Sequence, residues 1–149
     1  MKVEEIHLKL QERFGDAVGE LHTETKDPWI AVDAEQIDAV ARFCREDPAL
    51  YFDFLSSLCG VDAHESIDVV YHLYSYEHRH GVVLKVKVHK GKPLTKTVTT
   101  VWRGANWFER ETFDLFGVRF EGHPDLRRIM LPDDWEGYPL RKEYQFPTE

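Results

Sequence analysis

Hydrophobic residues recur at helical spacing at the start of the chain, at Val3, Ile6, Leu10 and Phe14. This spacing predicts a helix that stops at Gly15. Two short strands are predicted next, at 17–22 and 29–32, on either side of a polar turn. The first part of the chain is therefore expected to combine a helix with a pair of strands.

Two further helices are predicted between residues 33 and 60. Asp33 and Gln36 have the spacing of a capping box, which predicts that a helix begins there. Its apolar stripe consists of Ile37, Val40, Ala41 and Cys44. Asp47-Pro48 favours a new helix that ends at Gly60. The apolar face of this second helix would consist of Tyr51, Phe54, Leu55 and Leu58.

The middle of the chain has the alternating pattern of β-strands. Residues 67–76 are rich in Val, Ile and Tyr, and residues 82–88 alternate apolar and polar positions. The link between them predicts an antiparallel hairpin, and residues 95–102 predict a third β segment. Five lysines occur in this region, and their spacing favours the solvent-exposed side of a strand and a turn: Lys85, Lys87, Lys90, Lys92 and Lys96.

A last helix is predicted at 107–116, where Asn106 and Glu109 again have capping-box spacing and Gly117 is a stop. Beyond Val118, prolines and glycines interrupt any periodicity, although apolar residues continue to Tyr144. The predicted fold class is α+β: a small antiparallel or mixed sheet of about four strands flanked by helices. Residues 1–118 are expected to form the core domain, and residues 119–149 an extended arm that docks on partner subunits.

Composition limits the possible functions. The 149 residues are 42% hydrophobic and 13% aromatic, which favours one globular core. A net charge of −8 argues against binding to nucleic acid. No signal peptide is recognised and no apolar stretch approaches the roughly 18 residues that span a bilayer. A soluble chain is therefore expected, with membrane association only through partners.

The sequence offers little support for cofactor or nucleophile chemistry. Cys44 and Cys59 are expected as buried, reduced thiols on helical faces, and two cysteines cannot ligate a four-thiolate iron–sulfur cluster. No glycine-rich nucleotide fingerprint or serine elbow is present. Five histidines could suggest a metal, but exposed loop positions are the favoured interpretation: His72, His78, His80, His89 and His123. His123 could instead hydrogen-bond Glu109 or Glu111.

Glu109, Glu111 and Asp114 are the main candidates for chemistry. They could serve acid–base catalysis, bind a hard cation, order an interface through ion pairs, or anchor the arm internally. Glu109 and Glu111 are two apart, so a helix directs them to different sides, whereas Arg110 and Asp114 share a face. No catalytic, cofactor-binding or metal-ligating residue is therefore assigned. The candidate partner-interface residues are Glu109, Arg110, Glu111, Asp114, His123, Arg127, Arg128, Arg141 and Lys142.

The same region carries a family resemblance. Glu109-Arg110-Glu111, then Asp114, Leu115-Phe116, His123, Arg127 and Ile129-Met130, resembles the signature of the C subunit of respiratory complex I. Residues 131–144 also resemble that family, which is related to a component of energy-converting, membrane-bound hydrogenases. The resemblance implies a small α/β core and a tail that lies along neighbouring subunits.

The resemblance also implies a function and partners. It implies a non-catalytic subunit in the peripheral arm of a proton-translocating NADH–quinone oxidoreductase, at the cytoplasmic face of the cell membrane. The D subunit, which is similar to a hydrogenase large subunit, and cluster-bearing subunits would be the neighbours. FMN, iron–sulfur clusters and quinone would be held elsewhere in the complex. Two alternatives stay open, the equivalent subunit of an energy-converting hydrogenase and a stand-alone enzyme that uses the three carboxylates.

Overall fold

The computed structural model describes residues 1–146 and contains a five-stranded sheet, a two-stranded sheet and three α-helices. The helices are α1 (Val3–Phe14), α2 (Ile37–Glu46) and α3 (Ala105–Phe116), with a 3-10 turn at Gly15–Ala17. The strands are β1 (Val18–His22), β2 (Trp29–Val32), β3 (Phe54–Asp62), β4 (Ser66–Ser75), β5 (His80–His89), β6 (Leu94–Lys96) and β7 (Arg119–Glu121).

The large sheet is mixed and has the strand order β1-β2-β5-β4-β3. Only β2 and β5 pair in parallel, and the other three pairings are antiparallel. The small sheet pairs β6 with β7 in parallel. The prediction of an α+β fold with a mixed sheet is confirmed, as is the β4–β5 hairpin, although the large sheet has one strand more than expected.

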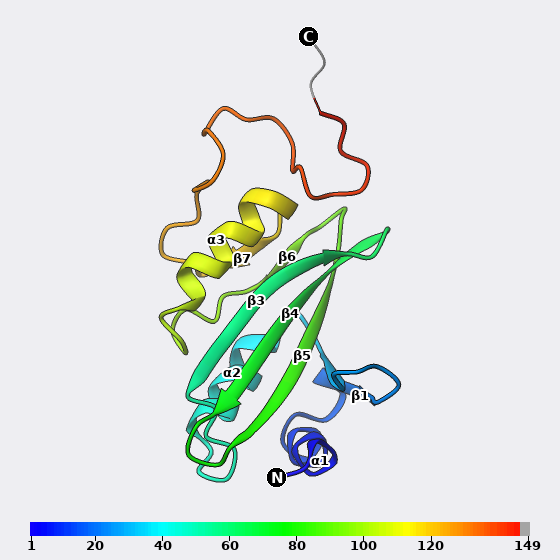
Figure 1. Ribbon diagram of the computed structural model, residues 1–149, viewed down its shortest axis with the longest axis vertical. Coiled ribbons are helices and arrows are strands. Elements are labelled where there is room, and N and C mark those ends of the chain that lie inside the picture. The colour runs from blue at the N-terminus through cyan, green and yellow to red at the C-terminus, as the bar shows by residue number, and fades with distance from the viewer. Residues whose placement is uncertain (147–149) are drawn as a thin grey trace.

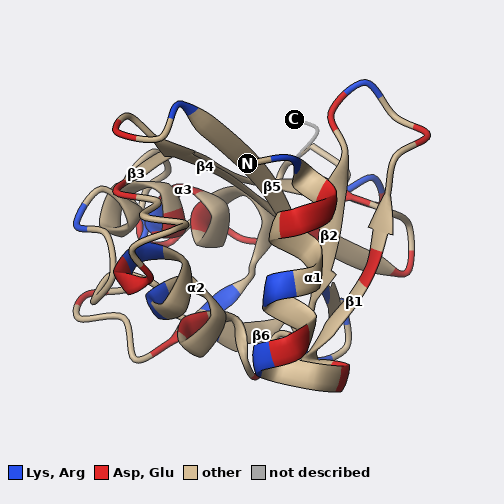
Figure 2. Ribbon diagram, turned by 90° about the horizontal axis from the view of Figure 1, so that it is seen from below, with Lys and Arg blue, Asp and Glu red and all other residues tan. Residues whose placement is uncertain are grey.

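The helices are distributed unevenly around the large sheet (Figure 1). In this view α2 lies behind the sheet, α3 lies beside β3 near the C-terminal end of the molecule, and α1 lies at the opposite end. Ile6, Ile37, Leu58 and Leu84 are among the fully buried side chains that join these elements in one core. Charged residues of both signs occur along α1 and α2 (Figure 2), as expected where only one stripe of a helix is buried.

The largest difference from the sequence prediction concerns residues 47–60, which do not form the predicted helix. A turn follows Asp47, and Phe54–Asp62 is β3. A register shift between Leu55 and Ser57 inserts an extra residue, so Leu55 and Leu58 both face the core although they are three apart. A β-bulge therefore produced an apolar spacing that resembles a helix.

Cys59 and Gly60 take on different roles as a result. Cys59 lies on a strand and is exposed, so the prediction of two cysteines on buried helical faces is wrong for Cys59. Cys44 is buried on α2, and its burial raises the pKa of the thiol to about 12. Gly60 does not end a helix. A Cβ there would approach the Phe116 ring to 2.7 Å, so the glycine allows α3 to lie close to β3.

Three smaller predictions are also wrong. The β segment expected at 95–102 is limited to β6, because the Val98 carbonyl accepts hydrogen bonds from the Val101 and Trp102 amides in a turn. Neither expected capping box forms: α2 is preceded by Gln36 and α3 by Gly104, without a side-chain cap.

Within residues 1–146, no helix is both long enough and apolar enough to cross a membrane.

Candidate subunit interface on α3 and the C-terminal segment

The segment after β7, residues 122–146, is called here the C-terminal segment, and Asp114 of α3 is its principal anchor. The Asp114 side chain is fully buried. Its Oδ1 accepts a hydrogen bond from Arg128 Nη1 at 2.8 Å. Its Oδ2 accepts three more, from the backbone amides of Ile129, Met130 and Leu131 at 2.7–3.1 Å. One carboxylate therefore fixes four consecutive residues of the segment.

These contacts determine the charge state of Asp114. Burial acts to raise the pKa of the carboxyl, but the hydrogen bonds from Arg128 and the three amides outweigh it, so the pKa lies below its usual value. Arg128 also donates to the Asp114 carbonyl and, at 2.9 Å, to the Gly137 carbonyl. Helical spacing placed Asp114 on the same face as Arg110, but the ion pair of Asp114 is with Arg128.

The C-terminal segment returns to the end of α3 near residue 140. The Leu140 amide donates to the Leu115 carbonyl at 3.0 Å, and Arg141 Nε donates to the Phe116 carbonyl at 2.7 Å. These two bonds satisfy carbonyls that a helix leaves unpaired at its C-terminus. The guanidinium groups of Arg128 and Arg141 both lie over the Tyr138 ring, each 5.1 Å from its centroid.

Gly117 makes this return possible. Its φ is +78°, and a Cβ there would lie 2.6 Å from the Tyr138 ring and 2.9 Å from the Arg141 guanidinium.

We expect Gly117→Ala to lower the free energy of unfolding by about 2 kcal/mol, because it combines backbone strain with a steric clash. Chemical denaturation of the full chain measures the loss. Gly91→Ala is the matched control, since no atom lies within 4 Å of a Cβ at that position. Equal stability of the two variants would contradict the prediction.

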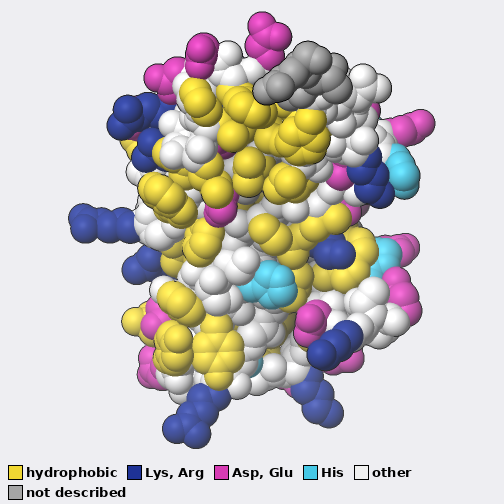
Figure 3. All heavy atoms as spheres, turned by 45° about the horizontal axis from the view of Figure 1, so that its top comes forward, with side chains coloured by type: hydrophobic (Ala, Val, Ile, Leu, Met, Phe, Trp, Pro, Cys, Tyr) yellow, Lys and Arg dark blue, Asp and Glu magenta, His cyan; other side chains and the backbone are white. Residues whose placement is uncertain are grey.

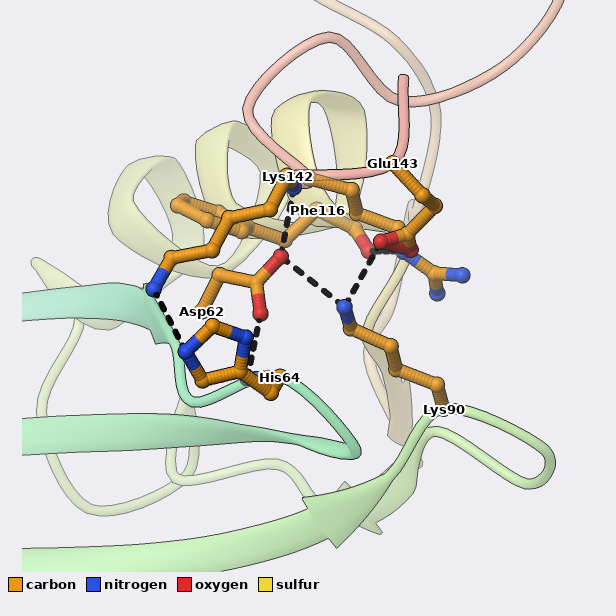
Figure 4. A network of polar contacts seen from close by, with 7 residues as sticks. Asp62, His64, Lys90, Phe116, Lys142 and Glu143 are labelled. Atoms are coloured by element: carbon orange, nitrogen blue, oxygen red, sulfur yellow. Dashed lines mark hydrogen bonds and ion pairs between the residues drawn. The ribbon is translucent and has the colours of Figure 1, made fainter.

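A group of charged residues also joins the C-terminal segment to the large sheet, at the end where β3 and β5 finish (Figure 4). Asp62, at the end of β3, accepts hydrogen bonds from Lys90 Nζ at 2.9 Å and from the Lys142 amide at 2.6 Å. Lys90 Nζ also pairs with Glu143 at 2.7 Å. Burial opposes the charge of Asp62, but donors from Lys142, Lys90 and His64 lower its pKa to about 2. The chain from 140 to 143 therefore joins α3 to the β3–β5 end of the sheet.

Sequence reasoning missed Asp62, Lys90 and Glu143. The spacing of the lysine run predicts a solvent-exposed Lys90, yet this residue lies between two carboxylates. Lys142 is a predicted interface residue, but its contribution to the cluster is its backbone amide, and its ammonium group contacts His64 Nε2 at 3.3 Å. No local pattern could have joined these residues, because Asp62 and Lys142 are 80 positions apart.

Glu109 is also an internal group. It is fully buried, and its carboxylate accepts hydrogen bonds from Thr97 Oγ1 at 2.5 Å and from the Val98 amide at 2.8 Å. Burial outweighs these bonds and raises the pKa of Glu109 to about 7. The nearby Tyr71 hydroxyl is buried, and burial followed by the Glu109 charge raises its pKa. Glu109 thus joins α3 to the turn after β6.

The other candidate interface residues make fewer contacts with the rest of the chain. Arg110 Nε is buried and has no hydrogen-bond partner among residues 1–146. His123 lies near Arg110, and Asn106 O is 3.3 Å from its Nε2, so neither glutamate is its partner. Burial is the main cause that lowers the pKa of His123. Arg127 is exposed and pairs with Asp125 at 3.0 Å, and Glu111 is partly exposed on α3.

Large apolar side chains remain exposed around this site. Those on α3 and the C-terminal segment are Trp107 (57% exposed), Met130 (56%), Leu140 (51%) and Phe146 (68%). Figure 3 turns this end of the molecule forward and shows hydrophobic side chains gathered across its upper part. Such gathering of exposed apolar side chains is typical of a protein–protein interface.

The arrangement of the carboxylates bears on their chemistry. Glu109 contacts the turn after β6, whereas Asp114 is occupied by Arg128 and backbone amides. The two groups therefore have separate partners and do not form a pair that shares a proton. In the part of the chain that the structure describes, no cluster of three or more His, Cys, Asp or Glu side chains could hold a metal ion.

Comparison with known proteins identifies the family of this chain. Residues 30–149 match the family model described as the 30 Kd subunit of respiratory-chain NADH dehydrogenase. The chain belongs to this family. Relatives named as the C subunit of NADH-quinone oxidoreductase include one from Roseiflexus castenholzii, 50% identical over 80% of this chain and 71% of its own length. Another, from Chloroherpeton thalassium, is 44% identical over 91% of this chain and 58% of its own length. The predicted resemblance to the C subunit is thereby confirmed.

Two solved structures share the fold of this 30 Kd-type chain. One belongs to a membrane-bound sulfane sulfur reductase, an archaeal respiratory membrane complex; its TM-score is 0.76 at 27% identity, over 97% of this chain and 86% of the other. The second is a trypsin-resistant fragment of Nqo5, with a TM-score of 0.65 at 29% identity, over 85% of this chain and the whole of the other.

Proposed function

We propose that this chain is a non-catalytic structural subunit in the peripheral arm of a proton-translocating NADH–quinone oxidoreductase. It would bind no cofactor, while FMN, iron–sulfur clusters and quinone would be held by other subunits. Its contribution to electron transfer from NADH to quinone would be to keep cluster-bearing neighbours in fixed positions. The D subunit, similar to a hydrogenase large subunit, is the proposed main partner, at the cytoplasmic face of the cell membrane. Membership of the 30 Kd-subunit family supports this proposal.

The observation that carries the proposal is the incomplete surface around α3. Arg110 Nε and Trp135 Nε1 are buried without a hydrogen-bond partner among residues 1–146, although buried polar groups are normally paired. Exposed apolar side chains lie on the same two elements, at Trp107 and Met130. A partner that covered this surface could bury the apolar groups, and it would reach the two donors if the Arg110 and Trp135 side chains reorient on binding.

The nine candidate interface residues would then act in two ways. Those that hold the C-terminal segment in place would shape the surface without touching the partner: Glu109, Asp114, Arg128 and Arg141. Those with accessible groups would contact the partner directly: Arg110, Glu111, His123, Arg127 and Lys142. Residues 1–118 and 119–149 are retained as the proposed core and arm, although β7 pairs with β6 and Phe120 is buried in the core.

A second candidate is the equivalent subunit of a different respiratory membrane complex, such as an energy-converting hydrogenase. The likeness to a chain of the sulfane sulfur reductase, over 97% of this chain, favours keeping this alternative. Purification of the tagged chain from its native membrane, with identification of the associated subunits, separates the two. NADH-binding flavoprotein subunits would support the first proposal, and nickel-containing subunits the second. Turnover or a stoichiometric metal in the isolated chain would contradict both.

Arg110 provides a direct test of the docking surface. We expect Arg110→Ala to reduce recovery of the assembled complex at least about tenfold, because the partner would lose a charged donor at a buried contact. The free energy of unfolding of the isolated chain should change by less than about 1 kcal/mol, since Arg110 Nε has no partner among residues 1–146. Quantitative co-purification and chemical denaturation provide the two readouts. Arg79→Ala, in an exposed hairpin turn, is the control. Comparable losses in both assays would place Arg110 in the internal core.

A further inference from the structure

A groove rich in arginine lies between the last turns of α2 and the turn that follows β6. Its volume is about 330 Å³, and three arginines line it, Arg42, Arg45 and Arg103. Thr99, Thr100, Val101 and Glu46 complete the lining. The only acidic residue among these, Glu46, is already 3.5 Å from Arg42 Nη1. The groove is therefore a positive region on a chain whose net charge is −8.

The walls of the groove are held in place by the fold. Arg45 donates a hydrogen bond to the Val101 carbonyl, and Arg42 Nη2 donates to Thr100 Oγ1 at 3.2 Å. The buried Trp102 anchors the same turn through a bond from its indole N–H to the Phe52 carbonyl at 3.0 Å. A preformed site costs less ordering when a ligand binds. Figure 2 shows basic positions on α2, the helix that carries Arg42 and Arg45.

Hydrogen bonds to the turn explain the positions of Arg42 and Arg45 in the groove, but they do not explain the position of Arg103. Arg103 is exposed and makes no hydrogen bond or ion pair with side chains in residues 1–146. Its position also joins two hollows. A second hollow of about 470 Å³ is lined by the same Thr99, Thr100 and Arg103, and continues to Asn106, Gly122 and Pro124. Because they share these residues, the two hollows are contiguous and extend beyond a single-point anion site.

We propose that this groove binds an extended, acidic segment of another polypeptide. The arginines would pair with carboxylates, for which guanidinium groups are well suited. The threonine hydroxyls and the Asn106 amide could bond the backbone of such a segment, because each can both donate and accept. The extent of the two contiguous hollows favours a peptide over a compact anion, which would occupy only one of them. The groove alone supports this inference, which does not depend on the assignment to NADH–quinone oxidoreductase.

The test uses the full-length chain and a hexaglutamate peptide. NMR titration of the isotope-labelled protein is expected to show saturable binding, with shifts of the Thr99, Thr100 and Arg103 amides. Arg103→Glu should raise the Kd about tenfold or more, since it replaces an attraction with a repulsion. Lys26→Glu is the matched control, because it reverses an exposed charge in the turn between β1 and β2 and alters the net charge equally. It should raise the Kd less than about twofold.

Thermal unfolding of both variants separates binding from folding, and both should match the wild-type chain because the two side chains are exposed. If Arg103→Glu unfolds early, Arg103→Gln, which removes the charge alone, is titrated in its place and should still weaken binding severalfold. Equal weakening by Arg103→Glu and Lys26→Glu would show that only net charge acts. Shifts confined to other surfaces would overturn the proposal. So would inorganic phosphate that binds as tightly as the peptide, because the groove would then recognise a compact anion.

Discussion

Replacing Asp114 with alanine is expected to lower the free energy of unfolding by about 3 to 5 kcal/mol, among the largest losses for any single substitution in this chain. The change would leave Arg128, whose side chain is only 11% exposed, without its carboxylate. It would also leave the amides of Ile129, Met130 and Leu131 without their acceptor. Each buried donor that loses its partner adds its own desolvation cost. Urea denaturation followed by circular dichroism measures the loss.

The Asp114 prediction has a control in the same segment. Asp134 is exposed, so Asp134→Ala should change the free energy of unfolding by less than about 0.5 kcal/mol. A second readout is local. Amide exchange at residues 129–131 should accelerate strongly in Asp114→Ala and remain unchanged in Asp134→Ala. Wild-type exchange rates at these amides in the Asp114 variant would mean that the C-terminal segment is held by other contacts.

Local patterns predicted the regular parts of the fold. The apolar stripe of α1 and the alternation in β5 both follow from side-chain burial on one face, so their ranges were close to correct. The same reasoning failed for β3, because the extra residue between Leu55 and Ser57 changed a period of two into an apparent helical spacing. A bulge depends on pairing with β4, and pairing with a distant strand is absent from the local pattern.

The residues of the candidate site could be predicted from the sequence, but the residues that they contact could not. Glu109, Asp114 and Arg128 stood out because charge was mixed with apolar residues in one segment. Their partners did not follow from helical spacing. Asp114 takes Arg128, fourteen positions away, since that arginine arrives together with three converging amides. A neighbour one turn away on the helix cannot offer the same set of donors.

The buried Glu109 makes the stability of the chain depend on pH near neutrality. The pKa of Glu109 is about 7 in the folded chain, against an ordinary value of 4.5. The folded chain therefore binds more protons than the unfolded chain between these two values, and its stability falls as pH rises. This difference between the two pKa values corresponds to about 3 kcal/mol of folding stability. The contribution is fully present below pH 4.5 and is lost once the pH passes 7.

Glu109→Gln isolates this effect, because the glutamine oxygen can accept from the Val98 amide and its NH2 group can donate to Thr97 Oγ1, while the side chain does not ionise. Free energies of unfolding would be measured for both proteins from pH 4.5 to 8. The variant should gain about 3 kcal/mol relative to the wild-type chain across that interval. His123 acts in the opposite sense, since its lowered pKa adds stability as pH rises toward 6.5, but it is present in both proteins and cancels in the difference. A difference that stays constant with pH would show that Glu109 is ionised throughout, with its two hydrogen bonds outweighing its burial.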